Sequence, residues 1–293
     1  MHFVLLAGLS LLVSTSALVE VESLVGYHER VGIPAATRIK EAEEKILAAQ
    51  AEGSRIVGGS VAPSNEHPYL AGLLITFFNV AGTSACGSSL VSSNRLVTAA
   101  HCWFDGRFQA NQFVVVLGSH FLFSGGIRIP TSNVVVHPWW SPATLQNDVA
   151  VIYLPTHVSL SATVQPIQLP HGLLWERFIG EWAVAAGYGR TSDQQVGISV
   201  NAVVSHVSLQ VISEAQCSAV FGHWAQPSNI CTNGVGGVGV CNGDSGGPLY
   251  VTRNGQRILV GISSFVAAAG CQLGFPSAFA RVTSFYSFIM QHM

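Results

Sequence analysis

Lysine is almost missing from this chain. Its two lysines, Lys40 and Lys45, both lie before residue 56, and residues 56–293 contain none. That segment carries eight arginines and eight acidic residues, so its formal charge is zero. A lysine ammonium begins to lose its proton near pH ~10.4, whereas an arginine guanidinium keeps its charge past ~12. The absence indicates adaptation to a strongly alkaline fluid. Avoidance of cleavage after basic residues is the alternative, and the retained arginines weaken it.

Other absences exclude whole classes of protein. The formal net charge of −2 gives no reason to expect a nucleic acid partner. Beyond the N-terminus no uninterrupted apolar run approaches ~20 residues, so we expect a soluble mature protein with no membrane partner. The histidines show no zinc-like spacing. Gly234, Gly236 and Gly239 match a dinucleotide fingerprint, but no helix can be expected after them. We therefore expect neither a metal nor a cofactor.

The first 55 residues have the composition of segments that are removed from a mature protein. Residues 1–17 combine a short apolar run with small residues at its end, which is typical of a secretory signal peptide, although basic residues are missing from its start. Residues 35–52 are rich in helix-favouring Ala, Glu, Lys and Ile. Arg55 follows Gly53-Ser54 and forms a candidate processing site. Residues 18–55 are predicted to be an activation propeptide, and a solvated helix with a linker is the alternative.

After residue 56 the pattern changes to short β-rich runs separated by turns. Runs of this length and spacing, with no long helical pattern between them, predict an all-β barrel or sandwich. Only two helices are expected there: one after Ser213, which has Gln216 at capping-box spacing, and one over residues 284–293. The predicted strands are 69–78, 89–98, 113–117, 133–136, 149–154, 182–186, 200–211, 248–252 and 258–264.

All six cysteines lie after residue 85, in a chain that begins with a predicted secretion signal. Oxidised pairs are therefore expected. Six cysteines allow 15 connectivities, and their spacing does not choose among them.

Four short stretches identify a family when they are taken together. They are Arg55-Ile56-Val57-Gly58-Gly59, Thr98-Ala99-Ala100-His101-Cys102, Asn147-Asp148-Val149-Ala150 and Gly243-Asp244-Ser245-Gly246-Gly247-Pro248. In this order and at these separations, residues 56–293 resemble the chymotrypsin-type serine proteases, and among them the insect digestive members.

The resemblance implies a fold and a set of disulfides. The fold is two six-stranded antiparallel β-barrels with a short C-terminal helix and a catalytic cleft between the barrels. The stretch 166–170 is the expected crossing from one barrel to the other. The implied disulfides are Cys86–Cys102, Cys217–Cys231 and Cys241–Cys271.

The resemblance also implies a catalytic mechanism. A serine hydroxyl needs a base that takes its proton and donors that hold the developing oxyanion. Ser245 would attack the scissile carbonyl, His101 would act as base and then as acid, and Asp148 would orient the imidazole. The backbone N–H groups of Gly243 and Ser245 would form the oxyanion hole. Taken singly, these residues could be a turn serine, a surface histidine and a surface carboxylate.

Activation is implied by the same likeness. Cleavage after Arg55 would free the ammonium of Ile56, which would fold inward and pair with Asp244. Because Gly239 stands where trypsin-like members carry an aspartate, a separate trypsin-like protease is the expected activator.

Substrate choice is expected to depend on the residues that the resemblance places in the specificity pocket. Gly239 would form the base, Ser277 one wall, and Ser264-Phe265-Val266 the strand that pairs with the substrate backbone. Val266 stands where chymotrypsins and trypsins usually have glycine, and its side chain would narrow the slot.

The sequence thus predicts a secreted, monomeric serine endopeptidase that cleaves after apolar residues and digests extracellular protein in a gut lumen. Gly239 disfavours cleavage after Arg or Lys. Protein or peptide substrates, an activating protease and protein protease inhibitors are its expected partners. A preference for large aromatic residues and a catalytically silent binding homologue are the alternatives.

Overall fold

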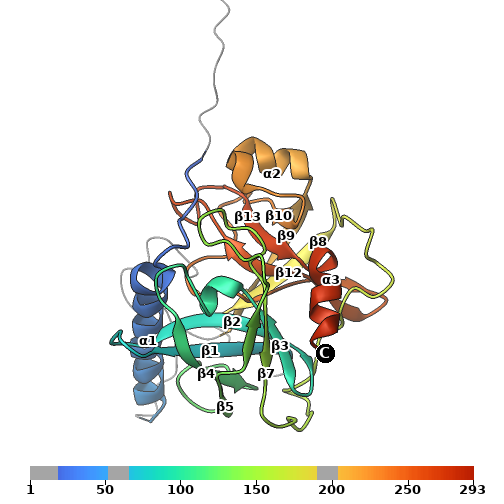
Figure 1. Cartoon of the computed structure of the whole chain (residues 1–293). Helices are drawn as coiled ribbons and strands as arrows, with labels where there is room; N and C mark the ends of the chain where they lie inside the picture. Colours follow the sequence, from blue (N-terminus) through green and yellow to red (C-terminus); the bar gives the residue numbers. More distant parts are fainter. Residues whose placement is uncertain (1–18, 52–65, 190–203) are drawn as a thin grey trace, which may run out of the picture.

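The structure is a computed structural model that describes residues 19–51, 66–189 and 204–293. The predicted signal peptide and the Arg55–Ile56 junction lie outside the described residues. Two β-structures stack on each other, and helix α1 runs along the side of the first (Figure 1).

The first β-structure is a barrel whose closing strand is broken in two. Its strands are paired in the order β5-β4-β1-β2-β3-β7-β6, all antiparallel. Only Ser132 and Asn133 separate β5 from β6, so the two edge strands are consecutive halves of one strand and the chain itself closes the ring. The bounds are β1 Leu70–Phe77, β2 Ser84–Ser92, β3 Arg95–Thr98, β4 Ala110–Leu117, β5 Ile127–Thr131, β6 Val134–Val136 and β7 Ala150–Tyr153.

The second β-structure is a closed six-stranded barrel in the order β10-β13-β12-β11-β8-β9. Its strands are β8 Trp182–Gly187, β9 Ser205–Ile212, β10 Asn229–Thr232, β11 Pro248–Arg253, β12 Gln256–Phe265 and β13 Ser277–Arg281. Fully buried Leu209, Ile230, Leu249 and Phe279 fill its interior. The predicted two-barrel fold is confirmed.

Some strand predictions were wrong in detail. The run predicted as one strand over residues 89–98 is a hairpin, in which β2 and β3 pair Leu90 with Leu96 around a turn at Ser93-Asn94. Strands β5, β10 and β13 were missed. All residues of β10 and β13 are buried, so neither shows the alternation of polar and apolar residues by which half-buried strands are recognised.

The segment predicted to cross between the barrels contacts both of them. The Ile167 N–H donates to the Leu90 carbonyl in β2 at 2.9 Å, and the Gln168 carbonyl accepts from the Leu259 N–H in β12 at 2.8 Å. The crossing therefore fixes one barrel relative to the other.

Three α-helices occur in the described part of the chain. Helix α2 (Glu214–Phe221) begins with the predicted capping box, in which Ser213 and Gln216 each accept from the other's backbone N–H. Helix α3 (Val282–Gln291) starts two residues before its predicted position. Helix α1 (Ile33–Ala51) follows a π-helical turn, η1 (His28–Gly32). This helix coincides with the stretch 35–52, whose composition predicts a helix, and it lies against the rest of the protein.

Helix α1 packs on the first barrel. Ala36 and Ile39 share an apolar cluster with Leu70, Val116 and Tyr188. The carboxylate of Glu43, which is 1% exposed, accepts from the backbone N–H groups of Leu122 and Phe123. The inner face of α1 is buried, so the helix is not fully solvated. The linker residues before Arg55 lie outside the described residues.

The three disulfides implied by the resemblance are all present: Cys86–Cys102, Cys217–Cys231 and Cys241–Cys271. A disulfide closing a loop of ~15 residues contributes ~3 kcal/mol in the chain-entropy model. The first bond ties the turn that carries His101 to β2, and the second ties residues 214–221 to β10.

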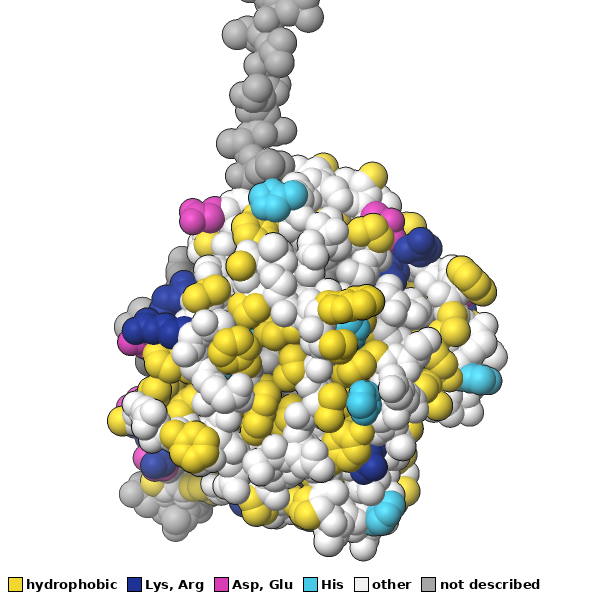
Figure 2. All heavy atoms as spheres, in the orientation of Figure 1, with side chains coloured by type: hydrophobic (Ala, Val, Ile, Leu, Met, Phe, Trp, Pro, Cys, Tyr) yellow, Lys and Arg dark blue, Asp and Glu magenta, His cyan; other side chains and the backbone are white. Residues whose placement is uncertain are grey.

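Charged side chains are sparse on the face shown in Figure 2, and apolar side chains are spread across it. Within the residues that the structure describes, no helix is both long enough and apolar enough to cross a membrane.

Candidate active site

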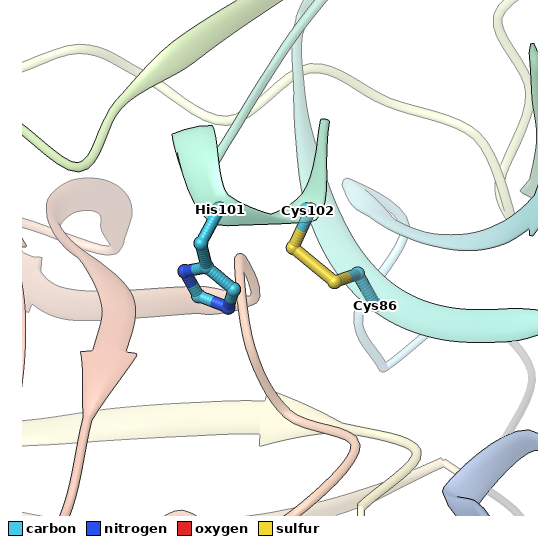
Figure 3. Close-up of side chains that lie close together, drawn as sticks. All are labelled: Cys86, His101 and Cys102. Atoms are coloured by element: carbon cyan, nitrogen blue, oxygen red, sulfur yellow. A yellow bond between two sulfur atoms is a disulfide. The ribbon is translucent and has the colours of Figure 1, made fainter. Parts of the chain in front are cut away.

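His101 and Asp148 form a buried pair between the end of β3 and the start of β7. His101 lies in the 3-10 turn η2 (Ala100–Cys102), and Cys102 of the same turn is bonded to Cys86 in β2 (Figure 3). Nδ1 of His101 lies 2.8 Å from Oδ2 of Asp148, and the backbone N–H of His101 donates to Oδ1 at 2.9 Å. Both residues are almost fully buried. The two bonds fix the orientation of the imidazole.

A third donor reaches the same carboxylate. Oγ of Ser264, in β12 of the second barrel, donates to Oδ2 of Asp148 at 2.7 Å. A buried carboxylate without partners would be costly, and these bonds satisfy it. From the sequence, Ser264 was expected only in the substrate-pairing strand. Its contact with Asp148 was missed because the two residues are distant in the sequence and belong to different barrels.

Ser245 lies in a tight loop that is held against both barrels. The Ser245 carbonyl accepts from the Gly87 N–H in β2 at 2.7 Å, and the Gly246 N–H donates to the Ser263 carbonyl in β12 at 2.8 Å. Gly246 has φ +79°, and a Cβ there would lie 2.2 Å from Oγ1 of Thr98. A glycine is therefore required at 246, because any side chain would push the loop off the first barrel.

Gly243 and Asp244 precede the serine in the same loop. Gly243 has φ +107° and packs closely against Gly189. The carboxylate of Asp244 accepts from the N–H groups of Gly189 at 2.8 Å and Cys241 at 3.0 Å. Burial raises the pKa of Asp244 to about 6, although these two hydrogen bonds act in the opposite direction. Among the described residues both donors to this carboxylate are neutral backbone N–H groups, so it is a good partner for an incoming cation.

The predicted specificity residues line two separate hollows. Gly239 and Asp244 line a cavity of about 330 Å³, and Ser277 lies directly behind Gly239, where a Cβ at 239 would be 2.8 Å from its Oγ. Ser264, Phe265 and Val266 line a smaller hollow beside Ser245. The structure thus brings Gly239 to Ser277 and Val266 to Ser245, but it does not join the four in one pocket.

Tyr27, from the segment before Arg55, contacts the catalytic candidates directly. Its ring packs edge-on against the imidazole of His101, with centroids 4.6 Å apart, and its hydroxyl donates to the Ala85 carbonyl at 3.2 Å. Burial raises the pKa of Tyr27 well above its ordinary range, and a hydrogen bond with the Ser245 side chain acts against this rise. Among the described residues, Nε2 of His101 has no hydrogen-bond partner. No local motif marks Tyr27, so sequence reasoning missed it.

A second cluster of metal-ligating side chains lies away from this site. Nε2 of His67 is 3.0 Å from Nδ1 of His206, which is 3.5 Å from a carboxylate oxygen of Glu66. Burial lowers the pKa of His67 to about 3, with further contributions from His206 and the cation of Arg257. The arginine disfavours a second cation, so this cluster is better explained as an anchor between the segment that precedes β1 and strand β9. Cys86, His101 and Cys102 also lie together, but both sulfurs belong to a disulfide.

Comparison with known proteins agrees with this arrangement. A profile of the trypsin family, described as Trypsin, matches residues 56–289. The chain is 39% identical to brachyurin of Leptuca pugilator, over 80% of this chain and 96% of that protein. It is 35% identical to a collagenase of Hypoderma lineatum, over 81% of this chain and 87% of that protein. A solved structure named HL collagenase superposes with a TM-score of 0.71 at 33% identity, and the match covers 81% of this chain and 98% of that one.

The family match begins at Ile56, the residue after the candidate processing site, and it spans both barrels and the His101–Asp148 pair. The chain therefore belongs to the trypsin family and is a chymotrypsin-like serine endopeptidase.

Proposed function

We propose that Ser245, His101 and Asp148 carry out acyl-enzyme peptide hydrolysis in this protein. The observation that carries the assignment is the buried His101–Asp148 pair, in which two hydrogen bonds fix the imidazole. The carboxylate holds the proton on Nδ1, which leaves Nε2 to take the proton of the Ser245 hydroxyl. The N–H groups of Gly243 and Ser245 hold the oxyanion.

A fluorophosphonate probe tests this assignment. It should label Ser245 in the mature enzyme, and His101→Ala should abolish labelling although Ser245 is still present. A mature enzyme that is folded but takes up no label would support the silent binding homologue. His223→Ala, at a histidine remote from this pair in the chain, serves as the matched control.

Activation by cleavage after Arg55 is the second part of the proposal. The new ammonium of Ile56 would enter the 330 Å³ cavity and pair with Asp244, whose carboxylate is held there only by backbone N–H groups among the contacts described. Gly239 offers no counter-charge to an arginine, so a separate trypsin-like protease is required. Purified proenzyme that converts itself to an Ile56 N-terminus, at a rate that rises with its own concentration, would refute this requirement.

We further propose that the mature enzyme cleaves after apolar residues. Gly239 itself carries no charge, and the oxygen of Ser277 lies directly behind it. Asp244 lines the same cavity, but in the mature enzyme its carboxylate would be paired with the Ile56 ammonium. Val266 lies beside Ser245, where its side chain would limit the size of the residue admitted. A peptide library that varies the residue before the scissile bond should give higher kcat/KM for Ala, Val or Leu than for Arg or Lys. A dominant preference for Phe and Tyr would support the aromatic alternative.

Secretion into an alkaline digestive fluid is the last part of the proposed function. The apolar segment 1–17 and the lysine-free protease domain support it. An α-ammonium normally titrates near ~7.7–8, and pairing with a carboxylate in a protein interior raises that pKa. The Ile56–Asp244 pair contributes fully at a pH below the pKa of a free α-amino group. Its contribution is lost as the pH rises through the raised pKa of the Ile56 ammonium in the folded enzyme. We therefore expect kcat/KM on a neutral peptide to stay level to about pH 10. An alkaline limb that falls by pH ~8.5 would contradict the alkaline role.

A further inference from the structure

The segment before Arg55 enters the cleft as an added β-strand. The Glu22 N–H donates to the Val266 carbonyl at 3.1 Å, and the Ala268 N–H donates to the Glu20 carbonyl at 2.9 Å. Val21 between them pairs antiparallel with Ala267 and is buried. These bonds lie at Val266 and Ala268, directly after β12 ends at Phe265, and Val266 belongs to the stretch assigned above to the substrate backbone.

The segment then reaches the catalytic residues and turns away from them. Leu24 is 3% exposed and lines the hollow beside Ser245. Its carbonyl accepts from the Tyr27 N–H at 3.1 Å, in a turn that contains Gly26 at φ +73°. The backbone after Leu24 therefore folds back and does not extend past Ser245 as a scissile peptide would.

Tyr27 then covers the catalytic base. Its ring packs on His101, and its hydroxyl donates to the Ala85 carbonyl. His101 is fully buried with this ring in place. A substrate carbonyl could not reach both Ser245 and His101 without displacing Tyr27.

Two further contacts hold the segment in the cleft. The His28 N–H donates to Oδ2 of Asp105 at 2.9 Å, and its Nδ1 lies 2.9 Å from Oγ of Ser84. Helix α1 continues the contact over the first barrel through Ile39 and Glu43. The contact thus extends from the stretch assigned to the substrate backbone to helix α1 along the side of the first barrel (Figure 1).

We propose that residues 19–51 form a peptide inhibitor that binds the substrate cleft, and that cleavage after Arg55 alone does not release it. The segment contains no cysteine, so only non-covalent contacts would retain it after cleavage. This inference rests on the proposed function, because it assigns an inhibitor to the same site. It predicts that inhibition ends when the cut segment dissociates or is digested.

The first experiment measures hydrogen exchange in the intact proenzyme, and it does not depend on catalysis. Glu22→Pro removes the N–H that Val266 accepts, and we expect faster exchange at the Ala268 amide. Glu22→Ala removes the same side chain but keeps that N–H, so it is the matched control and should preserve protection. Equal exchange in both variants, or no protection in the native chain, would overturn the proposal.

The second experiment adds a synthetic peptide of residues 19–51 to purified mature enzyme, residues 56–293. The native peptide should inhibit competitively, raising KM without changing kcat. Tyr27→Ala should weaken inhibition about 30-fold, because a buried aromatic anchor of an interface contributes ~2 kcal/mol or more. Tyr27→Phe keeps the ring on His101 and should weaken inhibition much less.

The outcomes separate the two proposals. The inhibitor proposal would be overturned by any of three results: no inhibition, inhibition that is unaffected by Tyr27→Ala, or rapid cleavage of the peptide after Leu24. A mature enzyme without activity would refute the proposed catalysis, and the hydrogen-exchange experiment would still decide whether the segment occupies the cleft.

Discussion

Replacing His28 should change how the stability of the proenzyme depends on pH. This residue is fully buried, and its ring packs on Phe77 with centroids 4.7 Å apart. Burial lowers the pKa of His28 from 6.5 to about 4, against the opposing effect of Asp105, and His101 lowers it further. His28→Phe keeps an aromatic ring and removes the titration.

The magnitude follows from the two pKa values. A pKa difference of one unit corresponds to ~1.4 kcal/mol, so a fall from 6.5 to about 4 corresponds to about 3 kcal/mol. The folded chain favours the neutral ring, so its stabilising contribution is full above pH 6.5 and is lost as pH falls toward 4. Loss of the Ser84 hydrogen bond should lower the stability of the variant by ~1 kcal/mol at every pH.

Urea denaturation measures this difference. Both chains would carry Ser245→Ala to prevent autolysis, and the free energy of unfolding would be measured from about pH 4 to about pH 8. The free energy of unfolding of the native chain minus that of His28→Phe should rise by about 3 kcal/mol as the pH rises across that range. His171→Phe, at an exposed histidine, is the control. A native-minus-variant difference that is constant with pH would refute the reasoning.

Three more changes test other contacts. Glu43→Gln should give the opposite slope, because burial raises the pKa of Glu43 from 4.5 to about 7. The native chain therefore loses stability relative to the variant as pH rises from 4.5 to 7, by about 3 kcal/mol in the same urea assay, and a variant with the slope of the native chain would contradict this. Val266→Gly should shift the ratio of kcat/KM for Phe over Leu substrates by roughly 10- to 200-fold, and an unchanged ratio would mean that the valine does not face the substrate. Ser264→Ala should lower the free energy of unfolding by ~1.5–3 kcal/mol, since Asp148 loses a donor, and a loss under ~0.5 kcal/mol would show that the bond is dispensable.

The sequence determined the family, both barrels and the His101–Asp148 pair. These features depend on local signals: glycines required by a tight loop around Ser245, a capping box at Ser213, and short β-rich runs with polar turns. Each signal lies within a few neighbouring residues, so it can be recognised without knowing the fold.

Only the tertiary structure decided what residues 19–51 do. Their composition predicts a helix, but nothing in it predicts that Tyr27 packs on His101, 74 positions later, or that Glu22 bonds with Val266. The same holds for Ser264 and Asp148, which belong to different barrels, and for the all-buried strands β10 and β13. These contacts depend on how the two barrels and the N-terminal segment pack together, and packing between distant segments leaves no periodic pattern in the sequence.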